Sequence, residues 1–317
     1  MKKEQRMLKI HSNIDVNNVL GSSGLDWRVA KKPVLVESNN SSCDYVASKD
    51  FMAVVRSDTQ DILGIVSDKY QPIQNEELLW CAERVSNGVL NLVSAGYTGN
   101  GERVYAQLNG NPWGIGPNKD EVYPTFVLSN GHDGNHPISG WPTTVRVICE
   151  NTLNMSGNLA KKRGHMMISL RHRGDVMGLL EEILNSVEEY HNRAEQFNIK
   201  ANALASSSLS VEQVQQFWTN VYTQMFGVIH TNVENEAQVQ ANKKAASVMI
   251  KWADTFDSEV KHSGANLWTA MNAVTNWLDH NQVYRGSGKT DNRFNDTVFG
   301  KGASEKVEVM NMALAHI

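Results

Sequence analysis

The sequence predicts an α+β fold, with a mainly antiparallel sheet and a long helix in the N-terminal half and helices alone in the C-terminal half. Short apolar runs separated by turn residues dominate up to about residue 172. From Asp175 onward the apolar residues recur with the 3.6-residue period of a helix. Because strands and helices are segregated along the chain, the fold class is α+β.

The β-rich half is predicted from apolar runs and the turn residues between them. Residues 1–50 look irregular, whereas two apolar runs within 51–66 predict a β-hairpin. Asn75 is placed to cap a helix that runs to about Asn87. The Asn-Gly step in Thr98–Gly101 predicts a second hairpin. We expect strands at 89–97, 103–109, 123–129, 143–149 and 166–170, and a short helix near 151–159.

The helical half begins with a long amphipathic pattern that Asp175 caps and that continues to Phe197. The Ser- and Ala-rich stretch 201–208 is expected to be a linker. Ser210–Gln213 then fits a capping box, which starts the next helix. Further helices are expected at 235–261, 265–282 and 303–315. The expected domains are an α+β domain at 1–200 and a helical region at 209–317.

Composition excludes several classes of protein. The 317 residues are 41% hydrophobic and 20% charged, which is typical of a globular domain and not of a disordered chain. The net charge of −4 excludes a uniformly basic nucleic-acid coat. Cys43, Cys81 and Cys149 stand far apart, so neither a disulfide framework nor a cysteine zinc site is expected. With no signal peptide and no run of about 18 apolar residues, we expect a cytoplasmic protein without membrane contact.

Several strings, spread over nearly the whole chain, resemble a known family. In the N-terminal half they are Gly24–Val29, Val66–Asn75, Ser129–Gly134 and Arg146–Leu153, which include Asn130, His132, Asp133 and Asn151, motif residues of unknown role. In the C-terminal half they are Trp268, Asn272–Thr275, Asp279-His280, Phe299-Gly300 and Lys306. Together they resemble the uncharacterised phage/plasmid-like protein family (domain of unknown function 932), most specifically in Arg146–Leu153. The resemblance implies an accessory product of phages, prophages or plasmids and supplies no catalytic residue.

One segment, the basic island at residues 144–174, carries a large excess of positive charge. It holds six basic residues and one acid, a net charge of +5, so the other 286 residues sum to −9. The basic residues are Arg146, Lys161, Lys162, Arg163, Arg171 and Arg173, and His165 and His172 add charge at mildly acidic pH. Such an island predicts a phosphate-binding surface. The alternative is a solvated loop whose charges pair with the acidic residues of the following helix, Glu181, Glu182, Glu188 and Glu189.

Aromatic side chains near the basic island are candidates for stacking on bases. Most aromatics of the β-rich half are expected in the core, because strands favour them. Trp113 and Trp141 lie beside prolines in what read as polar loops, so they are the better stacking candidates.

The run His132-Asp133-Gly134-Asn135-His136 has the residue types of a metal or acid/base site. Two histidines four residues apart share one face of a helix, but this Gly- and Asn-rich run is not helical. A turn that holds Asp133 by backbone hydrogen bonds is the simpler interpretation. Asp279-His280 is assigned to a helix surface. No complete catalytic motif and no cofactor fingerprint is present: Gly286–Thr290 lacks the first glycine of a phosphate-binding loop.

These observations favour a non-enzymatic protein that binds nucleic acid, with single-stranded DNA expected as partner and a homo-oligomer as the assembled form. By fold-level analogy the element order is loosely like that of ring-forming single-strand annealing proteins. Phosphates would lie along the basic island, and bases would stack on Trp113 or Trp141. One alternative is a metal-assisted hydrolase or nuclease using His132 and Asp133. Another is an interaction protein that recruits or blocks a host factor.

Overall fold

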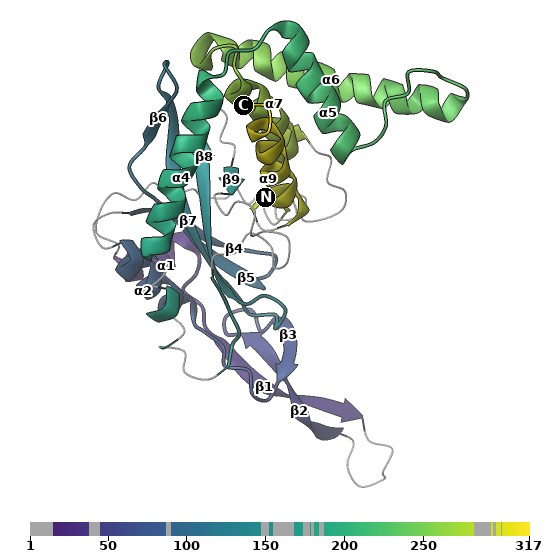
Figure 1. The fold of residues 1–317 in the computed structure, drawn as a ribbon. Coiled ribbons are helices and arrows are strands. Elements are labelled where there is room, and N and C mark those ends of the chain that lie inside the picture. Colours follow the sequence, from purple (N-terminus) through teal and green to yellow (C-terminus); the bar gives the residue numbers. More distant parts are fainter. Residues whose placement is uncertain are drawn as a thin grey trace. The chain divides into compact units, whose positions relative to one another are not determined.

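The computed structural model describes residues 15–37, 45–86, 90–146, 152–154, 168–173, 178, 181–183, 187–281, 293, 296–298 and 300–317. Within them the predicted α+β class is confirmed (Figure 1). Every named strand ends by Leu170, and the described chain from Val187 onward is built from helices. Among the described helices, none combines the length and the apolar character that crossing a bilayer requires.

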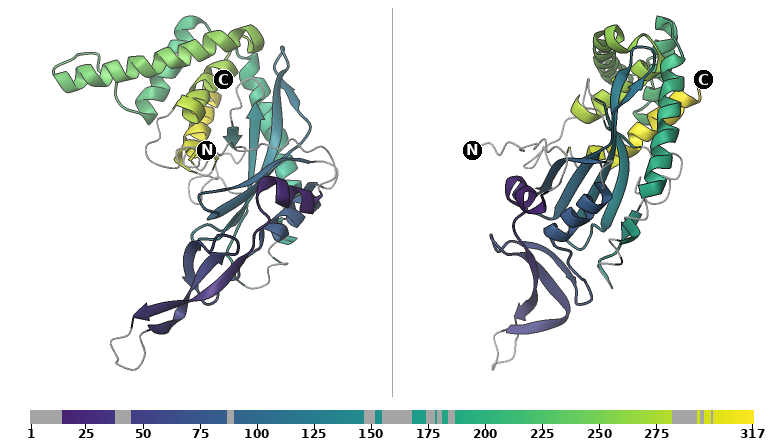
Figure 2. Two further views of the ribbon diagram at one scale, coloured as in Figure 1. Left: turned by 180° about the vertical axis from the view of Figure 1, so that it is seen from behind. Right: turned by 90° about the vertical axis from the view of Figure 1, so that its left-hand side faces the viewer.

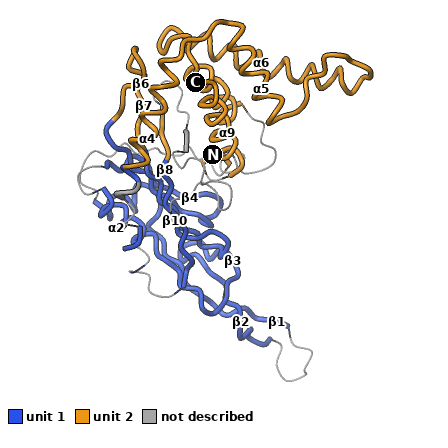
Figure 3. Tube along the Cα trace, in the orientation of Figure 1, with its two compact units in different colours: residues 1–111, 125–142, 166–191 blue, residues 112–124, 143–165, 192–317 orange. Residues whose placement is uncertain are grey.

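The chain divides into two compact units, each assembled from three segments (Figure 3). Unit 1 contains residues 1–111, 125–142 and 166–191. Unit 2 contains residues 112–124, 143–165 and 192–317.

Unit 1 is built on antiparallel strands. Its elements, in part or whole, are α1 (Val16–Ser23), β1 (Val29–Glu37), β2 (Tyr45–Arg56), β3 (Ile62–Ser67), α2 (Asn75–Ser86), β4 (Asn91–Thr98), β5 (Arg103–Asn109), β7 (Asp120–Gly131), β8 (Ile138–Arg146) and β10 (Ile168–Leu170). One sheet has the order β1-β2-β3, and the other has the order β10-β8-β7-β5-β4. The α1 and α2 helices contact β4, and α2 also lies along β5 (Figure 2). The apolar face of α2 buries Leu78, Leu79, Ala82 and Val85, which removes these side chains from water and stabilises the unit.

Unit 2 is mainly helical. Its elements are β6 (Trp113–Ile115), β9 (Thr152–Asn154), α4 (Val187–Ser206), α5 (Val211–Met225), α6 (Glu236–Ser263), α7 (Leu267–Asn276), a π-helical turn η2 (Trp277–Asn281) and α9 (Lys301–Leu314), with α4 beginning in unit 1. Every residue of α7 from Leu267 to Thr275 is buried, as expected for a helix surrounded by others. The helices α5, α6 and α9 contact it.

Most predicted elements are confirmed, and their chemistry is as expected. The β4–β5 hairpin turns at Thr98–Gly101, where Gly99 and Gly101 both have positive φ. Ser210 and Gln213 form the reciprocal capping box at the start of α5. Asn235 caps α6 through the backbone N–H of Gln238.

Other predictions were wrong, and each has a physical reason. The described part of 1–50 is ordered: it forms α1, β1 and the first half of β2, whose polar residues lie on an exposed sheet. Within the expected linker 201–208, residues 201–206 form the end of α4, where Ala201 and Leu204 are buried. The predicted helix near 151–159 includes the strand β9, and residues 155–159 lie outside the described part. Trp113 and Trp141 lie in β6 and β8, not in loops.

Candidate functional site

A buried polar network in unit 1 connects three of the strings that carry the family resemblance. Its centre is Asn75. We predicted that this side chain caps α2, but it is buried and does not cap the helix. The Nδ2 group donates to the carbonyl oxygens of Leu25 (3.1 Å) and Trp27 (3.0 Å). Its Oδ1 lies 2.9 Å from Nε2 of His132. Because the amide donates on one side, Oδ1 must accept, and His132 carries its proton on Nε2.

His132 lies at 0% exposure within this network. Burial, with smaller contributions from His172 and Arg56 and against the opposing effect of Asp133, lowers the pKa of His132 to about 3. The ring is therefore neutral at physiological pH. With the proton on Nε2, Nδ1 is an acceptor, and within the described chain it has no hydrogen-bond partner.

Arg56, at the end of β2, closes the network on another side. Its guanidinium lies 4.2 Å from the ring centroid of Trp27 and 4.9 Å from that of Tyr97, which are cation–π distances. Two nitrogens bind the carboxylate of Asp58 at 2.7 and 2.9 Å, and a third donates to the carbonyl of Asn100 at 2.6 Å. All of its contacts are internal, so Arg56 is a structural cation and not a free phosphate ligand.

The run 132–136 forms the turn that the sequence predicts. Oδ1 of Asp133 accepts the backbone N–H groups of Asn135 (2.9 Å) and His136 (3.0 Å), and Oδ2 lies 2.7 Å from Nδ1 of His136. Burial alone would raise the pKa of Asp133, but these hydrogen bonds outweigh it and lower the pKa to about 2. The turn packs on β3: a Cβ added to Gly64 would lie 2.6 Å from Cα of Asp133.

This geometry bears on the metal-assisted hydrolase that the sequence left open. Nowhere in the described chain do three His, Cys, Asp or Glu side chains gather as metal ligands. The His132 ring is enclosed, and the Asp133 carboxylate is occupied by its own turn. Asn130 is also enclosed and donates to the carbonyl of Ile73 at 3.0 Å. The motif residues at the end of β7 and in the turn that follows therefore connect segments of unit 1.

The described end of the basic island lies beside this network. His172 is buried and stacks on Tyr70, with ring centroids 4.7 Å apart. Its backbone carbonyl accepts the N–H of Gln71 at 2.9 Å, and its Nδ1 donates to the carbonyl of Gln71 at 3.3 Å. Arg171 and Arg173, on either side, are exposed. We predicted all three residues as nucleic-acid contacts. In the structure His172 is a buried packing residue, whereas Arg171 and Arg173 are exposed.

The other predicted nucleic-acid contacts divide into three groups. Trp141 is 5% exposed, so its ring is not open to a base in this structure. Trp113 is half-buried and stacks on Phe197, with centroids 6.4 Å apart. Lys161, Lys162, Arg163 and Asn151, together with the side chain of Arg146, lie outside the described part of the structure.

Unit 2 contains a buried ion pair that sequence reasoning missed. Nζ of Lys306 lies 2.6 Å from Oδ1 of Asp279, and both side chains are buried. Asp279 was assigned to a helix surface, whereas it lies on the inner side of the π-helical turn. Burial lowers the pKa of Lys306, and Asp279 opposes that shift. The available signal was the position of Lys306 on the apolar stripe of α9, between Ala303 and Met310.

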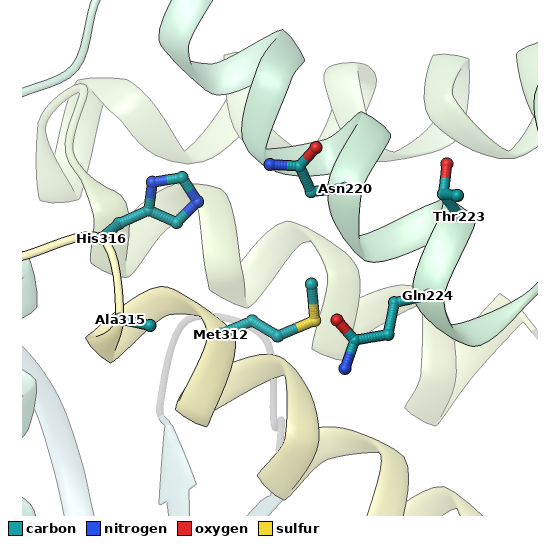
Figure 4. Close-up of a pocket in the computed structure, with 6 residues that line it drawn as sticks. All are labelled: Asn220, Thr223, Gln224, Met312, Ala315 and His316. Atoms are coloured by element: carbon teal, nitrogen blue, oxygen red, sulfur yellow. The ribbon is translucent and has the colours of Figure 1, made fainter.

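A shallow hollow of about 490 Å³ lies on unit 2 between α5 and the end of α9 (Figure 4). Its lining residues are Asn220, Thr223, Gln224, Met312, Ala315 and His316. It is open to solvent and holds no carboxylate, lysine or arginine, so its chemistry suggests no ligand.

The fold is that of a two-unit α+β protein, and the hydrogen bonds of Asn75, Asn130 and His132 stabilise its first unit. The chain belongs to the family described as domain of unknown function DUF932, whose model matches residues 62–299. Neither a curated protein nor a solved structure matches the chain.

Proposed function

We propose that this protein binds single-stranded nucleic acid, with DNA as the expected ligand, through the surface that carries Arg171 and Arg173. The observation that supports it is the anchoring of an exposed arginine pair by a buried residue. His172 fixes the backbone between the two arginines through its stacking on Tyr70 and its hydrogen bonds with Gln71. Both guanidinium groups therefore start from an ordered backbone, which reduces the entropy lost on binding.

The charges of this surface are available to a ligand. Among the described side chains, neither Arg171 nor Arg173 forms an ion pair, and the exposed Glu181 and Glu182 are not paired with them. Lys69, also exposed, precedes Tyr70, on which His172 stacks, and adds a third positive charge. In the part of the chain that the structure describes these three cations form no ion pair, and on a chain of net charge −4 they supply local positive charge for phosphate groups.

The biological setting is part of the same proposal. The resemblance of the motif strings to phage/plasmid-like proteins favours a mobile-element product that acts in the host cytoplasm. A homo-oligomer that aligns several such surfaces would follow a strand and act as an annealing or recombination accessory. The proposed activity is binding without catalysis.

The test is fluorescence anisotropy with a labelled single strand over a range of salt concentrations. Each phosphate contact contributes about −0.7 to the slope of log K against log salt for single strands. Changing Arg171 and Arg173 together to Ala should therefore weaken binding at low salt and flatten the slope by about 1.4.

The matched control removes two positive charges elsewhere. Lys243 and Lys244 are exposed on α6, and their double Ala variant should retain the slope of the wild-type protein. Equal losses in both variants would show only a net-charge effect and would contradict the proposed site. A wild-type protein that binds no strand at low salt would overturn the function itself.

A further inference from the structure

Exposed aromatic side chains are rare in the described chain, and they are not those that the sequence favoured. The large hydrophobic residues that are exposed include three aromatics: Tyr45 at 61%, Phe51 at 52% and Trp80 at 48%. Two of the three lie on β2, where an aromatic ring costs free energy by facing water. Trp141, by contrast, is buried, and the half-buried Trp113 stacks on Phe197.

Strand register places Phe51 in a defined group. Ala53 of β2 faces Lys32 of β1 and Ile65 of β3. Side chains two residues apart on a strand share a face, so Phe51 lies on the same face as Ala53. Lys32 and Ile65 are its diagonal neighbours, at a separation that long side chains span. This β1–β3 face therefore presents an exposed ring, an exposed aliphatic side chain and an exposed ammonium group.

The β1 edge of this small sheet is a poor template for another strand. Pro33 lies within β1 and has no N–H to donate, and the register shifts between Pro33 and Leu35. On β3 the backbone of Asp133 packs over Gly64, on the face opposite to Ile65 and Ala53. The Phe51 face is therefore not the one that this turn covers, and addition of an extended peptide to β1 is disfavoured.

We propose that the β1–β3 face is a base-stacking platform for single-stranded nucleic acid, with Phe51 under a base and Lys32 beside the adjoining phosphate. This inference rests on the proposed function and names the groups that would bind the bases. An exposed ring supplies a sequence-tolerant surface, because every base has a π-face. The only charged residue among Lys32, Phe51, Ala53 and Ile65 is the lysine, whose ammonium donates to Oε1 of Gln60 at 2.7 Å and whose positive charge complements a phosphate. Tyr45, further along β2, offers a second ring roughly 20 Å away.

The experiment compares an oligothymidylate strand with the matching abasic strand, which has the phosphates and no bases. Phe51→Ala should bind the thymidine strand about 5- to 100-fold more weakly than the wild type. It should bind the abasic strand as the wild type does, because only the stacking contact is lost. Phe51→Trp should retain affinity for the thymidine strand, since it keeps a flat ring.

Trp80→Ala is the matched control, because it removes an exposed aromatic from α2, away from the β1–β3 face. The platform is wrong if wild-type protein binds strongly while Phe51→Ala loses no more affinity than Trp80→Ala. It is also wrong if Phe51→Ala weakens both strands equally, since that change would be structural. Failure of wild-type protein to bind either strand would instead overturn the proposed function. Phe51→Leu, which keeps an apolar side chain and removes the ring, should weaken thymidine binding in the same direction as Phe51→Ala.

Discussion

The buried neutral His132 makes the stability of unit 1 depend on pH. Its pKa falls from about 6.5 in the unfolded chain to about 3 in the folded one, mainly through burial. Because the folded pKa is the lower of the two, the contribution to stability is complete above pH 6.5. It is lost as the pH falls from 6.5 towards 3, since the unfolded chain binds the proton first.

The size of the effect follows from these two pKa values. Between pH 7.5 and pH 5, His132 alone should lower the free energy of unfolding by about 2 kcal/mol. Near pH 5 the slope should approach about 1.4 kcal/mol per pH unit. His172, whose pKa burial also lowers, adds to the loss in the same direction. Asp133, with a pKa of about 2, stays ionised throughout this window.

Two measurements test this reasoning. Urea denaturation at pH 7.5, 6 and 5 gives the slope, and histidine NMR gives the folded pKa of His132 directly. His132→Gln keeps an amide donor for Asn75 and removes the titrating ring, so its slope should be shallower by about 1.4 kcal/mol per pH unit near pH 5. His262→Gln, at an exposed position of α6, should leave the slope unchanged. A folded His132 that titrates near pH 6.5 would refute the argument, because burial would then carry no cost.

The remaining predictions concern packing and the buried ion pair. Gly64→Ala should destabilise the protein by about 1–3 kcal/mol in urea denaturation, because its Cβ would meet the backbone of Asp133. Gly21→Ala, a helical glycine with nothing within 4 Å of the added Cβ, should instead stabilise it by about 0.5–1 kcal/mol; a loss at both sites would contradict the packing argument. Asp279→Ala should cost about 3–5 kcal/mol, because it leaves the ammonium of Lys306 buried without that carboxylate. An Asp279→Ala midpoint equal to that of the wild type would show that the pair is dispensable.

Local chemistry made much of the fold predictable. The turn glycines of the β4–β5 hairpin and the Ser210 capping box act within a few residues, so sequence alone specifies them. The α+β class followed from the change of hydrophobic period near residue 175. The Ser- and Ala-rich stretch 201–208 has the composition of a linker, because Ala201 is small and Leu204 is an isolated apolar residue. Only tertiary packing buries these two side chains, and sequence does not show that packing.

Only part of the candidate site was recognisable in the sequence, and the roles of its residues were not. The strings around Asn75 and His132 were recognisable, but their contact joins residues 57 positions apart. An asparagine at a helix start favours a cap, and only the surrounding carbonyls of Leu25 and Trp27 direct its amide elsewhere. Exposure decides which aromatic rings are open to a base. The sequence shows that Trp141 lies beside a proline, but it does not show that this tryptophan is buried in a strand.

Because the segments of the two units alternate along the chain, they determine when unit 1 can be complete during synthesis. Unit 1 draws its last segment from residues 166–191, so a ribosome must release the first 191 of the 317 residues before this unit can be complete. The Asn75–His132 hydrogen bond has both partners earlier, but the stack of His172 on Tyr70 must wait. Dividing the gene at a single position therefore yields no fragment that contains one complete unit and no part of the other. Any chaperone that holds the nascent chain would do so while the sheet of unit 1 still lacks its final strand.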